Sequence, residues 1–167
     1  MPHLTVALTN ARQANASWCW AAVASNVYDV LNPAAPMTQC EVATAVKQNC
    51  AAPAAADLQN VLTAIKVFSS SETTQAEFFE KIVAALTQGV PVCAEVGFTA
   101  GPHHFVAIVG VDSDSHHVWI ADPFPGGEPI EFAFDDFRDR YAFPGNGTLG
   151  AGEKDGTVTA LFLVHKP

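Results

Sequence analysis

Cys19 follows a short polar loop and stands at the start of a predicted amphipathic helix. The first turn of a helix carries unpaired N–H groups and a partial positive charge, and both favour the thiolate, which is the nucleophilic form of cysteine. Gln13 lies six residues before Cys19, so its side-chain amide can donate to an oxyanion that forms beside the sulfur. These residues are therefore candidates for a nucleophile and an oxyanion donor. The plainer alternative is that Cys19 is a small buried hydrophobic residue, the usual role of a free cysteine.

A second group of candidates lies in the second half of the chain. His103 and His104 come directly before the apolar run 105–111, which leads through a turn to a second apolar segment that ends at Asp122. A β-hairpin with this turn places Asp122 opposite His104, where the carboxylate can accept a hydrogen bond from one ring nitrogen and hold the other towards a thiol. Adjacent residues of a strand face opposite sides, so only one of the two histidines can face Cys19. We assign that position to His104, which adjoins the apolar run.

The elements that would position these residues change character halfway along the chain. In the first half, apolar residues recur at helical steps behind capping signals, which predicts helices that start near Cys19, Thr38, Asp57 and Thr74. In the second half the pattern predicts strands over 92–98, 105–111, 117–121, 129–134 and 157–165, a helix over 134–141 and a glycine-rich loop over 145–156. We therefore expect an α+β fold, with an N-terminal helical half packed against a C-terminal antiparallel β-sheet, as a single domain over residues 1–167.

Composition excludes several other classes of protein. The chain of 167 residues is 49% hydrophobic and 15% charged, which is typical of a protein with a packed core. Lys and Arg number 8 against 17 Asp and Glu, for a net charge of −9, and there is no basic run, so we expect no nucleic-acid partner. No apolar stretch approaches the roughly 20 residues of a spanning helix, so we expect no membrane insertion. The first residues show no signal peptide.

The candidate residues occur in an order that resembles that of the papain-like cysteine peptidases: Gln13, Cys19, His104 and Asp122. The runs Ser-Trp-Cys-Trp-Ala-Ala over 17–22 and Gly-Pro-His-His-Phe-Val over 101–106 look most like the small bacterial branch that contains the AvrRpt2-like effectors and the C39-like peptidases. The resemblance covers residues 13 to about 135. Two positions differ from relatives, because classical papain-like enzymes have Asn where this chain has Asp122, and bacteriocin-processing C39 enzymes have Gly where it has Trp20.

The resemblance implies a papain-like fold with a cleft between its helical and sheet halves, and a role for each candidate: Gln13 as oxyanion-hole donor, Cys19 as nucleophile, His104 as general base and Asp122 as the residue that orients it. It implies a cysteine endopeptidase that hydrolyses peptide bonds through a thioester acyl-enzyme, with no cofactor and no metal. The expected partner is a protein or peptide substrate, and an inhibitor or immunity protein is a further candidate. We expect a monomer that a bacterium secretes or translocates.

Three alternatives stay open at this point. A deamidase or transglutaminase can share the fold and the triad and differ only in the acceptor of the acyl group. A binding module can retain the scaffold without catalysis. A structural metal protein is suggested by the pairs His103-His104 and His116-His117, although consecutive residues on a strand diverge and so do not form a tight ligand set.

The remaining cysteines predict structural roles. Cys40 and Cys50 are ten residues apart and are expected to form a disulfide if the protein works outside the cytoplasm. A continuous helix would separate them by about 15 Å, whereas bridged Cα atoms lie within about 7 Å. The bridge therefore requires the helix after Thr38 to stop near Val46 and the chain to fold back. The alternative is two unrelated thiols in a cytosolic protein. Cys93 lies in a predicted strand and is expected to be a core residue.

Overall fold

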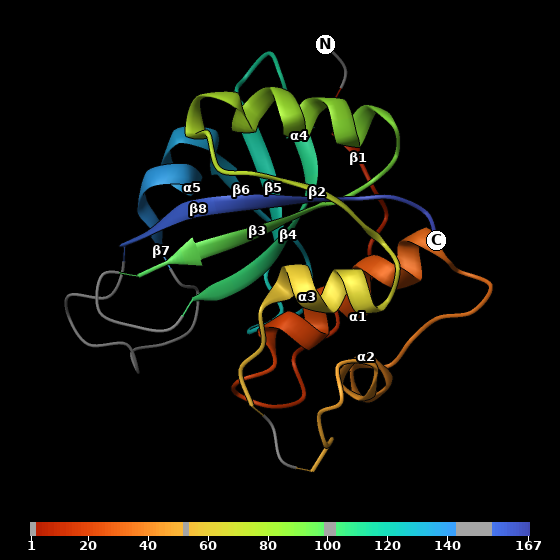
Figure 1. Cartoon of the computed structure of the whole chain (residues 1–167). Helices are drawn as coiled ribbons and strands as arrows, with labels where there is room; N and C mark the ends of the chain where they lie inside the picture. Colours follow the sequence, from red (N-terminus) through yellow and green to blue (C-terminus); the bar gives the residue numbers. More distant parts are fainter. Residues whose placement is uncertain (1–2, 52–53, 99–102, 143–154) are drawn as a thin grey trace.

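An antiparallel β-sheet forms the centre of the molecule (Figure 1). The computed structural model describes residues 3–51, 54–98, 103–142 and 155–167. Within them the strand order is β2-β8-β3-β4-β5-β6, with two short strands added, β1 beside β4 and β7 beside β8. The strands are β1 Leu4–Thr5, β2 Phe68–Glu72, β3 Val92–Gly97, β4 His104–Asp112, β5 His117–Ala121, β6 Ile130–Ala133, β7 Tyr141–Ala142 and β8 Asp155–Val164.

Helices cover both faces of this sheet. In the described residues the α-helices are α1 Cys19–Leu31, α2 Gln39–Ala45, α3 Leu58–Ala64, α4 Phe78–Thr87 and α5 Phe134–Arg140. The first three lie on one face and the last two on the other (Figure 1). This is the α+β fold that the sequence predicts, and the second layer of helices explains why β3 and β4 are buried on both faces. Among the described helices, none has both the length and the apolar character needed to cross a membrane.

Several helix boundaries lie where the sequence signals predict them. α1 ends at Leu31, immediately before Asn32 and the proline that follows it. The capping box of α2 is present, since the Thr38 side chain accepts from the N–H of Glu41 while the Glu41 carboxylate accepts from the N–H of Thr38. Asp57 caps α3 by accepting a hydrogen bond from the third residue of that helix. These local signals therefore determine the starts of two helices and the end of a third.

The segment before α4 differs from the prediction. Thr74 makes no capping hydrogen bond with its side chain, and a 3₁₀ turn over Gln75–Glu77 precedes α4. Glu72 accepts hydrogen bonds from the N–H groups of Thr73 and Thr74, the two residues before this turn. The sequence also gave no sign of β2, Phe68–Glu72, which pairs with β8 at the edge of the sheet. Three serines on this exposed edge strand remove the alternation that marks a strand.

The β4–β5 hairpin has a different register from the one predicted. Ile108 lies opposite Ile120, and an irregularity follows on the turn side of this pair. Continued to the open end of the hairpin, this register places Asp122 opposite Val106 rather than opposite His104. The cause lies in the turn, where Asp112 pairs with His117, and an extra residue accommodated on β4 offsets only part of the resulting shift. The predicted loop over 145–156 lies mostly outside the described residues, and Gly156 belongs to β8.

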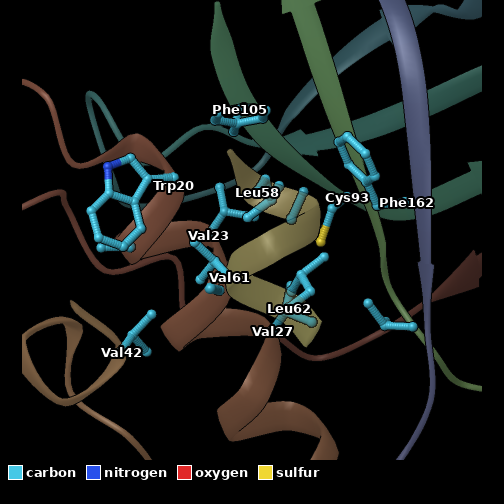
Figure 2. Packing of buried hydrophobic residues seen from close by; sticks show 14 of the residues in the cluster. Trp20, Val23, Val27, Val42, Leu58, Val61, Leu62, Cys93, Phe105 and Phe162 are labelled. Carbon is cyan, nitrogen blue, oxygen red and sulfur yellow. The ribbon is translucent and has the colours of Figure 1, made fainter. Parts of the chain in front are cut away.

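The core has one part on each side of the sheet. On the side of α1, apolar residues of α1 and α3 pack against β3, β4 and β8, and the sulfur of Cys93 points from β3 towards α3 (Figure 2). On the other side, α4 and α5 pack against the opposite face of the same strands. Cys93 is fully buried, as the sequence predicts. Helix α1 is therefore held firmly against the sheet, which fixes the position of its first residue.

Candidate active site

His104 and Asp122 meet at the open end of the β4–β5 hairpin. Nε2 of His104 lies 3.0 Å from Oδ1 of Asp122. Both side chains are buried, with 8% and 0% of their surface exposed. His104 is the first residue of β4 and Asp122 directly follows β5, so two paired strands hold the two side chains. The structure therefore brings these residues together even though the backbone register is shifted.

Cys19 lies beside the His104–Asp122 pair. It is the first residue of α1, its side chain is partly buried, and it interacts with His104 closely enough to raise the pKa of the imidazole. Because Nε2 of His104 contacts Asp122, the nitrogen that faces the sulfur is Nδ1. The N-cap residue Trp18 makes no capping hydrogen bond with its side chain. The N–H groups of the first turn, including that of Cys19, therefore have no acceptor within the helix.

The surroundings of His104 favour its charged form. Burial alone lowers the pKa of His104, but hydrogen bonds with Asp122 and Cys19, together with the charges of these two groups, raise the pKa to about 9. The imidazolium therefore predominates at neutral pH. A cation held beside a sulfur favours the thiolate.

Further polar groups hold Asp122 in place. Its Oδ1 also accepts from the N–H of Phe124 at 2.8 Å, and its Oδ2 accepts from the hydroxyl of Tyr141 at 2.5 Å. The side chain of Asn10 donates to its backbone carbonyl at 2.9 Å. Sequence reasoning missed Asn10 and Tyr141, because nothing local marks a tyrosine or an asparagine that lies far along the chain from its partner. Their only signal is that the fold buries them.

Gln13 lies in the loop before α1, but its side chain is not arranged as predicted. Both hydrogen bonds of its Nε2 go to carbonyls of its own loop, those of Asn15 at 2.9 Å and Ala16 at 2.8 Å. Its Oε1 is buried and has no hydrogen-bond partner among the described residues. The backbone N–H of Gln13 donates to the carbonyl of Pro123 at 2.8 Å. The structure therefore ties Gln13 to the segment that carries Asp122, with its amide donors turned into the loop.

Two further contacts fix the position of this loop. Gln39, the first residue of α2, holds the backbone on both sides of Gln13, since its Oε1 accepts from the N–H of Ala14 and its Nε2 donates to the carbonyl of Arg12, each at 2.9 Å. On the other side, Gly126 packs directly against Arg12, where an added Cβ would come within 2.9 Å of that residue. The loop is therefore held between α2 and the segment that follows Asp122.

The other histidines lie in separate places. His103 has 58% of its side chain exposed and its Nδ1 lies 3.1 Å from a carboxylate oxygen of Glu95. His116 stacks on Phe79, with ring centroids 3.9 Å apart, and His117 bonds to Glu131 on the neighbouring strand. Within the described residues, no group of three or more His, Cys, Asp and Glu side chains could hold a metal ion.

The cysteines divide into a bridged pair and two free thiols. Cys40 and Cys50 form a disulfide with Cα atoms 5.3 Å apart. As the bridge requires, α2 ends at Ala45 and the chain turns back through Lys47, which has a φ of 61°. Cys93 is free and buried, and burial raises its pKa to about 12. Of the two free thiols in the described residues, Cys19 is the one that interacts with a histidine, His104.

Comparison with known proteins identifies the family and the fold of the chain. The model of a family described as "Peptidase_C39 like family" matches residues 4–147. Among solved structures, the chain is similar to the peptidase domain of Streptococcus ComA, a bi-functional ABC transporter involved in a quorum sensing pathway, with a TM-score of 0.62 and 12% sequence identity over 96% of this chain and 98% of that one. At this identity the likeness establishes the fold. No curated protein matches the chain.

Proposed function

The chain belongs to the peptidase C39-like family, and on that basis we propose that it is a cysteine endopeptidase whose reacting groups are Cys19 and His104, with Asp122 orienting the histidine. The observation that carries the proposal is the arrangement of Cys19 beside His104, whose Nε2 is hydrogen-bonded to Asp122. A thiol, a buried base and a carboxylate in this order are the parts that thiol-based acyl transfer requires.

In the first half of the proposed reaction, the Cys19 thiolate attacks the carbonyl carbon of a peptide bond. The carbonyl oxygen becomes an oxyanion, and the C–N bond then breaks as the imidazolium of His104 gives its proton to the departing amine. This leaves the acyl group on sulfur as a thioester. The high pKa of His104, about 9, keeps this proton in place at neutral pH until the amine leaves.

In the second half, water hydrolyses the thioester. Neutral His104 takes a proton from water as the oxygen attacks the acyl carbon, and the C–S bond breaks to release a carboxylic acid and the Cys19 thiolate. His104 is again an imidazolium, so each proton and electron pair is accounted for. Asp122 keeps Nε2 occupied throughout and thereby keeps Nδ1 directed at the sulfur.

The oxyanion has one donor in place and one that must rearrange. The backbone N–H of Cys19 lies in the uncapped first turn of α1 and is available without any movement. Gln13 becomes the second donor only when its Nε2 leaves the carbonyls of Asn15 and Ala16. We therefore expect Gln13→Ala to reduce turnover less than the loss of Cys19 or His104.

A peptide-library digest read by mass spectrometry tests the proposal. We expect internal peptide bonds to be cleaved by the wild-type chain and to stay intact with Cys19→Ala. A mass increase of one dalton on a glutamine side chain, or coupling of an added amine, would instead show acyl transfer at side chains. Absence of all three reactions, together with no labelling of Cys19 by a thiol-directed electrophile, would contradict the proposal and favour a binding module.

We also propose that the protein works outside the cytoplasm, as the AvrRpt2-like effectors in its predicted branch would. The supporting observation is the Cys40–Cys50 disulfide, since such bridges persist mainly in oxidising compartments. The proposed substrate is a protein or peptide, and the proposed active form is a monomer. Peptide mapping without reductant, on protein purified from its native compartment, should recover the two cysteines as one linked fragment; two free thiols there would contradict the localisation.

A further inference from the structure

The carboxylate of Asp122 is held through both of its oxygens. Oδ1 contacts Nε2 of His104 at 3.0 Å and accepts from the N–H of Phe124 at 2.8 Å. Oδ2 accepts from the hydroxyl of Tyr141 at 2.5 Å. The side chain of Asp122 has no exposed surface, so solvent does not replace a donor that is removed. The orientation of the carboxylate therefore depends on these donors.

The ring of Tyr141 is fixed independently of Asp122. Tyr141 directly follows α5, and its backbone pairs with Gly156 of β8. Its ring is fully buried and packs against Phe132 and, edge-on, against Phe137, with centroids 5.4 Å and 5.6 Å away. The hydroxyl therefore approaches Asp122 from a direction that the aromatic packing determines.

Tyr141 also stays protonated. Burial and the negative charge of Asp122 raise the pKa of Tyr141 well above its usual value. The phenol therefore remains a hydrogen-bond donor at every pH at which a cysteine–histidine pair hydrolyses peptides.

We propose that Tyr141 is a positioning residue for the reaction at Cys19: its hydroxyl fixes the Asp122 carboxylate so that Oδ1 stays on Nε2 of His104 and Nδ1 stays directed at the sulfur. The inference rests on the proposed function and extends it to a residue that does not contact the substrate. The hydroxyl also draws negative charge from the carboxylate, which limits how tightly Asp122 holds the proton of the imidazolium. Removal of the hydroxyl therefore has two consequences, a less ordered carboxylate and a more firmly held proton on His104.

Tyr141→Phe tests both consequences, and the chain provides a matched control. The sequence holds two tyrosines, and the hydroxyl of the other, Tyr28 of α1, accepts a hydrogen bond from Nδ2 of Asn32 at 3.0 Å. In Tyr141→Phe we expect kcat to fall about tenfold or more, since a hydrogen bond to a charged group is lost, with KM changed less than twofold. The His104 titration followed by NMR should move to higher pH. Tyr28→Phe should change neither measurement.

A second control separates the hydroxyl from the packing of the ring. Phe137→Leu loosens the aromatic contact of Tyr141 but leaves its hydroxyl in the chain. Phe137→Leu should lower the free energy of unfolding without moving the His104 titration to higher pH. The proposal is overturned if Tyr141→Phe keeps wild-type kcat and titration, or if Phe137→Leu reproduces both changes.

If Tyr141→Phe does not fold, a nearly isosteric replacement of Tyr141 tests the proposal instead. In a Tyr28→Phe background, biosynthetic incorporation of 3-fluorotyrosine labels Tyr141 alone. The fluorinated phenol is more acidic and a stronger donor, so the His104 titration should move to lower pH, opposite to the effect of removing the hydroxyl. An unmoved titration would overturn the proposal. The titration needs no substrate, so failure of the positioning role is distinguishable from failure of the proposed peptidase activity, which the library digest reports.

Discussion

Cys19 and Cys93 pack against the same hydrophobic core but have opposite chemical surroundings. Cys93 lies within β3, is fully buried, and has a pKa raised to about 12 because burial penalises its charged form. Cys19 begins a helix, is partly exposed, and lies beside a buried histidine whose pKa is raised to about 9. The element that carries the sulfur therefore sets its surroundings: the interior of β3 buries Cys93 among apolar residues, whereas the start of α1 places Cys19 beside His104.

The largest difference between the two cysteines should be in turnover. Cys19→Ala removes the proposed nucleophile, so kcat for peptide hydrolysis should fall by about 10⁵-fold or more. Cys93→Ala removes only packing, so it should keep wild-type kcat and lower the free energy of unfolding by about 1 kcal/mol. Rates of peptide cleavage and urea denaturation measure both effects. Comparable loss of turnover in the two variants would contradict the different roles assigned to Cys19 and Cys93.

The next largest difference should separate the two adjacent histidines. His104→Ala removes the group that gives Cys19 its charged neighbour, and we expect kcat/KM to fall by about 10⁴-fold. His103→Ala removes an exposed side chain that contacts Glu95, so turnover should change less than threefold. Steady-state kinetics with one peptide substrate compares the variants. A larger loss in His103→Ala would show that the wrong histidine has been assigned.

Alkylation compares the two sulfurs without any substrate. At pH 6, iodoacetamide should modify Cys19 at least about a hundredfold faster than Cys93, because Cys93 has almost no thiolate and is buried. In His104→Ala, the rate at Cys19 should fall. Peptide mapping of partly alkylated, native protein gives both rates from one sample. Equal modification of the two cysteines at this pH would contradict the proposed pairing of Cys19 with His104.

The smallest expected effect is on the pH dependence of stability. The pKa of His104 is about 9 in the folded protein and near 6.5 in the unfolded chain, so the folded state binds this proton more tightly. Its contribution, at most about 3 kcal/mol, is fully present below about pH 6.5 and is lost as the pH rises through 9. Cys19→Ala should lose part of this dependence, because Cys19 is one of the causes of the raised pKa, whereas Cys93→Ala should retain it. Urea denaturation at pH 6 and pH 9 measures the difference, and identical slopes in the two variants would contradict the coupling.

Local signals in the sequence were sufficient for much of the fold. The capping box at Thr38, the cap at Asp57 and the proline after Asn32 act over a few residues, and each determines a boundary where predicted. The edge strand β2 was missed because its partner, β8, lies about 90 residues later and its serines carry no alternation. The prediction of a cap at Thr74 was wrong, since its side chain makes no capping hydrogen bond and a 3₁₀ turn precedes α4.

The candidate site was predictable to a similar extent. Cys19, His104 and Asp122 could be selected because each sits at the end of an element, where side chains of paired elements converge. The hydrogen bonds of Gln13 could not be predicted, since they depend on the conformation of its loop. The role of Tyr141 could not be predicted for another reason, since Tyr141 reaches Asp122 only after α5 has folded back against β8. Residues that act through tertiary packing leave no local pattern.

Gly126 lies where the structure has room for the hydrogen atom of a glycine but not for a larger side chain. With a φ of +68°, it lies where a Cβ would come within 2.9 Å of Arg12, in the loop that carries Gln13. Any larger side chain therefore pushes that loop away from the segment that begins at Asp122. The separation of the two loops is thus adjustable from a position that takes no part in the reaction. In natural or laboratory evolution, substitution of Gly126 would therefore widen the site without changing any reacting group.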